Sequence, residues 1–124
     1  RSLQSITLPD ELTSIGSGAF VYCESLQSVD LPGGLTSIGF GAFRGCTSLQ
    51  SIDLPGGVTS IGRYAFNGCA SLQTCLIRSE FLNDYGDLAF DSCSSLTGIY
   101  VPAISVDTYK AGWPSYAGLI RAIQ

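Results

Sequence analysis

The chain has 124 residues, enough for one domain, and its net charge of −4 comes from scattered acidic residues with no histidine present. Charged residues make up only 13% of the sequence, and no basic cluster could neutralise phosphates, which argues against nucleic acid as a partner. No apolar run approaches the roughly 20 residues that a membrane-spanning helix needs, so we expect no membrane insertion.

One pattern of 23 residues recurs along most of the chain. Residues 3–25, 26–48 and 49–71 are near-copies, and a looser fourth copy begins at Leu72 and gains one residue before Leu96. A fixed period in this range is typical of a solenoid, in which each repeat must stack on its neighbours to bury its apolar face. We therefore predict an α/β solenoid of about five short coils over residues 1–101.

The first part of each copy, Leu-x-x-Ile-x-Leu-Pro, predicts a short strand. In the third copy Ile52 and Leu54 are two residues apart and face one side, whereas Ser51 and Asp53 face the other. Pro55 lacks a backbone N–H and should end the strand. Stacked copies would then form parallel strand ladders, with each strand bonded to the next coil.

The second part of each copy predicts another strand and a turn. Residues 58–62 are rich in β-branched side chains and favour a second extended piece. Ala65, Phe66 and Cys69 have the spacing of a single helical turn that faces inward. The phenylalanines at this position should stack as an aromatic spine in the core: Phe20, Phe43, Phe66 and Phe90.

Four of the five cysteines occupy one repeat position, namely Cys23, Cys46, Cys69 and Cys93. Free cysteine behaves as a small buried hydrophobe, so we interpret them as a thiol spine in the core. Cys75 stands in the isoleucine position of the first strand. A disulfide between spine neighbours stays open, because about 5 Å would separate them although their Cβ vectors run parallel.

Coil four departs from the pattern over residues 77–86, where the proline is lost and charge increases. Adaptation to a cap is favoured over a dedicated contact site, because terminal solenoid repeats are commonly atypical. The period stops at Tyr100, and we predict a C-terminal cap over residues 102–124.

Within this cap, Ser105 is a candidate N-cap for a short helix over residues 106–111, and Gly112 suits the end of that helix. Residues 117–123 predict a last short helix or strand. Trp113 is expected to cover the open apolar end of the final coil rather than to contact a ligand.

The sequence contains few residues that could carry out catalysis. Without histidine, Cys-His and Ser-His-Asp machinery is unavailable, and no cofactor is predicted. Asp30 and Asp53 fall at the same outward position of adjacent coils and could share a proton or hold calcium. A carbohydrate-active enzyme that uses these two residues is therefore the least favoured functional alternative.

The outward side chains of the first strands form a strip that is polar and acidic at one end and apolar and aromatic at the other. We predict that this strip is concave and binds a protein, as extended solenoid faces generally do. A structural spacer without a ligand is the alternative. The strip residues are Ser28, Asp30, Ser51, Asp53, Leu76 and Tyr100.

The full pattern, Leu-x-x-Ile-x-Leu-Pro-x-x-Leu-x-x-Ile-Gly-x-x-Ala-Phe-x-x-Cys, resembles the BspA-like, Treponema-type leucine-rich repeat over residues 3–101. Residues 100–110, with Trp113 and Tyr116, resemble the ending that such proteins often have. The resemblance implies a leucine-rich-repeat solenoid, secretion or display on the cell surface, and, in some members, adhesion to host matrix or cell-surface proteins.

The N-terminal end offers no cap sequence, so self-association through the first coil is also expected. The chain begins at Arg1 within a repeat, and we expect upstream coils and any export signal to lie outside it.

Overall fold

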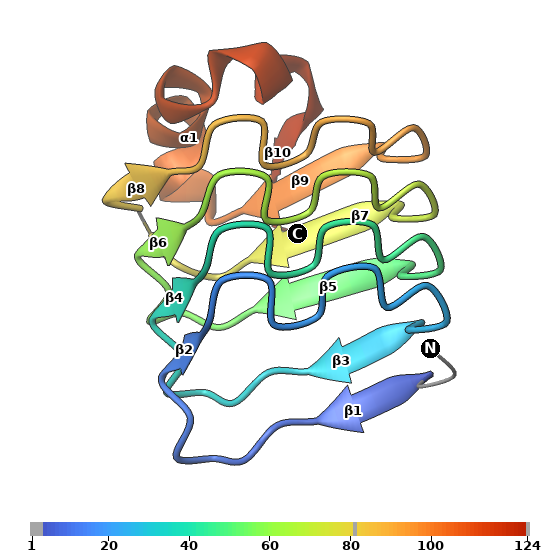
Figure 1. The fold of residues 1–124 in the computed structure, drawn as a ribbon. Helices are drawn as coiled ribbons and strands as arrows, with labels where there is room; N and C mark the ends of the chain where they lie inside the picture. Colours follow the sequence, from blue (N-terminus) through green and yellow to red (C-terminus); the bar gives the residue numbers. More distant parts are fainter. Residues whose placement is uncertain (1–3, 81, 124) are drawn as a thin grey trace.

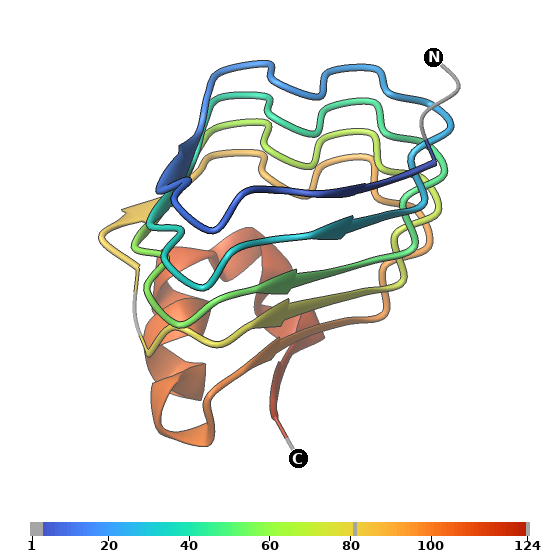
Figure 2. The ribbon, with the colours of Figure 1, turned by 90° about the horizontal axis from the view of Figure 1, so that it is seen from below.

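The computed structural model describes residues 4–80 and 82–123, so the predicted positions of Leu3 and Phe81 lie outside the described residues. Successive coils stack one upon another, and a helical segment covers the C-terminal end of the stack (Figure 1, Figure 2). Each of the first four coils contributes one strand to each of two faces, as the repeat pattern predicted, and the fifth contributes a strand to one face only. Equivalent residues of successive coils therefore lie above one another, as a shared apolar interior requires.

The strands of each face are short and run parallel. Equivalent residues pair across coils, as in Ser37 with Ser60, and the inserted residue shifts the next pair to Ser60 with Asp84. The second strands are β2 (Ser14–Ile15), β4 (Ser37–Ile38), β6 (Ser60–Ile61) and β8 (Asp84–Tyr85). The first strands are β1 (Ser5–Thr7), β3 (Ser28–Asp30), β5 (Ser51–Leu54), β7 (Thr74–Ile77) and β9 (Gly98–Val101).

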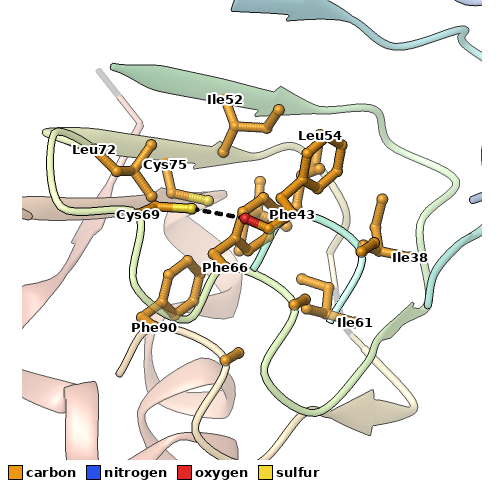
Figure 3. Packing of buried hydrophobic residues seen from close by; sticks show 14 of the residues in the cluster. Ile38, Phe43, Ile52, Leu54, Ile61, Phe66, Cys69, Leu72, Cys75 and Phe90 are labelled. Atoms are coloured by element: carbon orange, nitrogen blue, oxygen red, sulfur yellow. Dashed lines mark hydrogen bonds between the residues drawn. The ribbon is translucent and has the colours of Figure 1, made fainter. Parts of the chain in front are cut away.

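The alternating burial of the first strands is confirmed. In β5, Ile52 and Leu54 are buried while Ser51 and Asp53 are exposed. The aromatic spine is confirmed too, with its phenylalanine rings stacked nearly parallel inside the coils (Figure 3). The centroid distances are 5.3, 5.4 and 5.5 Å, with interplanar angles of 11°, 1° and 5°, for Phe20–Phe43, Phe43–Phe66 and Phe66–Phe90.

The predicted thiol spine lies beside the phenylalanines, and Figure 3 shows the Cys69 thiol directed at the Phe43 carbonyl. Burial raises the pKa of the Cys46 thiol to about 11 and that of Cys93 to about 12. Cys46, Cys69, Cys75 and Cys93 are free thiols in this structure, and the three that belong to the spine point at backbone carbonyls rather than at one another. The Sγ–O distances are 3.1, 3.2 and 3.1 Å for Cys46–Phe20, Cys69–Phe43 and Cys93–Phe66.

The single helical turn predicted at Ala65, Phe66 and Cys69 is wrong, because this segment forms consecutive hydrogen-bonded turns. Tyr64 has a φ of +61°, the sign required at the third residue of a type II turn. The N–H of Phe66 donates to the carbonyl of Ala89 in the next coil at 2.8 Å. A backbone that bonds between coils cannot also complete a helical turn.

Glycine follows the second strand of each coil because the coils approach closely there. A Cβ added at Gly62 would lie 2.6 Å from the carbonyl carbon of Gly39 in the preceding coil. Real Cβ atoms essentially never come so near to backbone, so the Ile-Gly element of the repeat is set by the distance between coils.

The cap consists of α1 (Val106–Gly112), two short 3-10 helices over Ala103–Ser105 and Pro114–Leu119, and β10 (Ile120–Ala122). The helix begins after Ser105 as predicted, but the Ser105 side chain makes no capping bond and donates instead to the Glu80 carbonyl. Strand β10 pairs in parallel with β9, which extends the first-strand face beyond the last coil.

Coil four and the cap are packed together. Trp113 is buried with its ring 5.2 Å from that of Phe90, and its Nε1 donates to the Gly86 carbonyl at 3.0 Å. The Tyr109 hydroxyl donates to the Ser79 carbonyl at 2.8 Å. Residues of the irregular stretch of coil four thus bind the cap, in agreement with the predicted adaptation of this coil to the cap.

Candidate binding surface

The six predicted site residues all lie on the outward side of the first strands, and we call this set the strand strip. Ser28, Asp30, Ser51 and Asp53 are exposed, whereas Leu76 and Tyr100 are half-buried. Strand pairing places Asp53 opposite Leu76 and Leu76 opposite Tyr100. The structure therefore brings the C-terminal part of the strip together in one sheet.

A break in strand pairing divides the strand strip. Strand β3 pairs only with β1, and a separate sheet runs from β5 through β7 and β9 to β10. The second-strand ladder continues across the same junction, and the Gly41 N–H donates to the Arg63 carbonyl at 2.9 Å. The expectation that every first strand bonds to the next coil is thus wrong at this junction, where β3 and β5 form no ladder and the coils are joined on this face by the Gln50 N–H, which donates to the Gln27 carbonyl at 3.4 Å.

The two acidic residues beside the break, Asp30 and Asp53, form hydrogen bonds on opposite sides of it. Thr7 donates from Oγ1 to Asp30 Oδ2 at 3.3 Å, on the side of the first coil. Arg78 donates from Nε and Nη2 to Asp53 Oδ1 and Oδ2 at 2.9 and 3.0 Å, on the side of coil four. Like charges at opposed strand positions disfavour pairing, which gives a physical reason for the break between Asp30 and Asp53.

These hydrogen bonds also test whether Asp30 and Asp53 could share a proton or hold calcium. Both carboxylate oxygens of Asp53 are bonded to Arg78, and the bond to Asp53 raises the pKa of the guanidinium. Asp53 is therefore held in an ion pair rather than presented to Asp30 as a second acid. Among the described residues, no group of three or more acidic or cysteine side chains is arranged to hold a metal ion.

A hollow of about 400 Å³ opens at the break. Leu31 is half-buried and offers apolar surface, Val29 is buried beneath it, and the charged groups stand exposed around them. Six residues from three coils line this hollow, namely Val29, Asp30, Leu31, Asp53, Pro55 and Arg78. The strand strip thus contains a concavity with apolar and charged walls.

Sequence reasoning missed Arg78, although a signal was present. Arg78 stands where the other coils have the strand-ending proline, as at Pro55. Its N–H donates to the Leu54 carbonyl at 3.0 Å, a bond that proline could not make. Because Arg78 is a cation at the proline position of the coil that follows Asp53, the sequence indicated this ion pair.

None of the helices in the described residues combines the length and the apolar character needed to cross a bilayer. The parallel ladders, the stacked phenylalanine spine and the outward strip define a leucine-rich-repeat solenoid. The chain belongs to the family of the BspA type leucine rich repeat region, whose model matches residues 1–111.

Solved structures of bacterial leucine-rich-repeat proteins are similar to this chain. A leucine rich cell surface protein from Faecalibacterium prausnitzii has 35% identity and a TM-score of 0.81 over 89% of this chain and 28% of its own. A leucine-rich repeat protein from Bacteroides ovatus has 27% identity and a TM-score of 0.77 over 98% and 37%. The Treponema pallidum leucine rich repeat protein has 27% identity and a TM-score of 0.62 over 83% and 59%.

The chain thus spans 28%, 37% and 59% of the lengths of these three proteins. A search among curated proteins finds no match. The chain is a leucine-rich-repeat protein related to bacterial cell-surface proteins, in a family of generally non-enzymatic repeat proteins.

Proposed function

We propose that the chain is a non-enzymatic binding module of a secreted or cell-surface protein, and that the strand strip binds a protein such as a host matrix or cell-surface protein. The hollow at the break between β3 and β5 is the observation that carries this proposal. The hollow brings apolar and charged side chains from three coils together on the outward face, which supports a role in binding rather than in packing.

The chemistry of the hollow suits a particular kind of partner side chain. Leu31 can contact an aliphatic stem, while the exposed Asp30 carboxylate can accept hydrogen bonds from a cationic end. Lysine and arginine combine these two properties. Leu76 and Tyr100, further along the strip, provide the half-buried apolar contact area typical of the centre of a protein interface.

Binding of the immobilised chain to a panel of matrix glycoproteins tests the proposal. The double variant Asp53→Lys with Tyr100→Ala should weaken binding by about tenfold or more, because it removes an ion pair and an aromatic contact. The matched control, Asp107→Lys with Ile104→Ala, makes the same charge reversal and another truncation of a large apolar side chain at exposed positions of the cap. Affinity that is the same in both double variants, with both still folded, refutes the assignment.

The two alternatives make different predictions. A spacer would bind no member of the panel, and a domain beyond the coils would carry the activity. A carbohydrate-active enzyme would turn over a polysaccharide and lose this turnover in Asp30→Asn. The Asp53–Arg78 ion pair speaks against the enzyme, because it occupies the carboxylate that would assist Asp30.

Self-association through the first coil is a further part of the proposal. In the described part of the chain β1 pairs only with β3, and Ile6 and Phe20 are half-buried where Ile52 and Phe66 are buried. An open strand edge beside apolar side chains favours contact between two copies. Sedimentation velocity should show a dimer that Ile6→Lys weakens, and a monomer at every concentration would contradict this.

A further inference from the structure

A cluster of aromatic and arginine side chains lies on the turns that follow the second strands, outside the strand strip. The guanidinium carbons of Arg44 and Arg63 each lie 5.0 Å from the ring centroid of Tyr64. Phe40 meets the same ring edge-on, with a centroid distance of 5.6 Å and an interplanar angle of 81°. We call these four residues the cation–aromatic patch.

Stacking of the coils does not require these side chains. The position of Phe40 and Arg63 in the repeat is held by Ser17 in the first coil and by Asp87 in the fourth. All four residues at this position stand on the same turn, yet only the two middle coils place large apolar or cationic groups there. The patch is thus a local property of coils two and three.

The backbone of Tyr64 supports a role beyond packing. Its φ of +61° is one that glycine adopts most readily, and Gly18 and Gly41 occupy the same position in the first two coils. Leu88, with a φ of +56° in coil four, lines a hollow against the cap. Tyr22 and Ser92 also have a positive φ, but the ring of Tyr64 is the one that both arginines contact.

The two arginines of the patch keep their hydrogen-bonding capacity for a ligand. In the described residues the one ion pair joins Arg78 to Asp53, and the guanidinium groups of Arg44 and Arg63 donate no hydrogen bond to protein acceptors. Each guanidinium offers five N–H donors. Two such groups on one ring form a site of positive charge on a chain with a net charge of −4.

The form of the patch favours side-chain recognition of a ligand. Phe40 is 49% exposed and offers an aromatic surface next to the cations. The backbone of these turns is bonded from coil to coil, as in Gly41 N–H to Arg63 O at 2.9 Å and Gly45 N–H to Asn67 O at 2.8 Å. An extended peptide therefore finds no free strand edge to pair with, whereas a sugar ring can stack on the aromatic side chains.

From these observations we propose that the cation–aromatic patch binds an anionic polysaccharide. The guanidinium groups of Arg44 and Arg63 bind its sulfate or carboxylate groups in the paired geometry that arginine favours, and Phe40 packs against a sugar ring. This site is separate from the strand strip and does not depend on the protein-binding function.

Titration of the purified chain with dextran sulfate, neutral dextran and polyglutamate tests the proposal. Dextran sulfate should bind and lose affinity as salt is raised, and neutral dextran should not bind. Arg44→Gln with Arg63→Gln should lower the affinity by about tenfold or more. The control, Lys110→Gln with Arg121→Gln, removes the same charge elsewhere and should leave the affinity unchanged.

Two further variants separate a polysaccharide from an acidic protein segment. Tyr64→Gly removes the ring at a position where other coils have glycine, so the fold should persist while dextran sulfate binding falls. Phe40→Ala should weaken dextran sulfate but not polyglutamate. The proposal is overturned if polyglutamate binds more tightly than dextran sulfate, or if the arginine variant binds dextran sulfate as well as the control does.

Discussion

Replacement of Phe66 by alanine tests the stacked core most directly. Phe66 is fully buried, and its ring lies parallel to those of Phe43 and Phe90, with centroid distances of 5.4 and 5.5 Å. The coils on both sides are bonded through their backbones, so the cavity cannot close easily. We expect Phe66→Ala to lower the free energy of unfolding by about 3–5 kcal/mol, near the upper end because two aromatic pairs are lost.

The chain offers a matched control at the open end of the same column. Phe20 is half-buried and stacks on one ring, that of Phe43 at 5.3 Å. Its replacement by alanine removes the same atoms but leaves a site that water already reaches in part. We expect Phe20→Ala to cost about 1–2 kcal/mol.

Urea unfolding followed by circular dichroism and by the fluorescence of Trp113, the only tryptophan, gives both values. Because net stabilities of domains are about 5–15 kcal/mol, the Phe66 variant should remain measurable but unfold at clearly lower urea. Equal losses for the two variants would show that the phenylalanine column is not a continuous core, and the reasoning would fail.

Three further predictions concern the coil spacing, the thiols and the ion pair. Gly62→Ala should destabilise by about 1–3 kcal/mol because its Cβ meets backbone, whereas Gly34→Ala, with open space around it, should change thermal stability little; equal effects would contradict the close approach. The pKa of Cys46 is raised from 9.0 to about 11, so its stabilisation is complete below pH 9 and is lost as the pH rises towards 11. Urea unfolding at pH 10 should show a loss of about 1 kcal/mol from this thiol that Cys46→Ala does not show, and equal losses in the two proteins would contradict its burial. Arg78→Ala should change the midpoint of thermal unfolding little, because the ion pair with Asp53 is exposed on both sides; a clear loss of stability would mean that this pair holds the coils together.

The repeat allowed much of the fold to be predicted from particular residues. The spacing of Leu26, Leu49 and Leu72 sets the register, and the alternation at Ile52 and Leu54 sets the inward face. These inferences succeed because a solenoid uses mostly local chain geometry and contacts between equivalent positions. Residues 65–69 form turns in place of the predicted helical turn, because a spacing of one and three residues does not report the sign of φ, which is positive at Gly68.

The candidate surface was predictable only in part. The outward position of Asp53 follows from strand alternation, but its partner Arg78 comes from the next coil and from a position that normally holds proline. The cation–aromatic patch combines residues from coils two and three and has no counterpart in the other coils. Contacts of this kind depend on which side chains of neighbouring coils reach one another.

The sequence by itself determined the coil, its period and its buried face, because identical coils repeat the same local preferences and the same need to cover apolar side chains. Only the tertiary structure decided that the strand ladder is interrupted between β3 and β5, and which charged groups bond across the coils. The physical reason is that repetition specifies equivalent contacts, whereas the break and the ion pair arise where adjacent coils differ or where like charges meet.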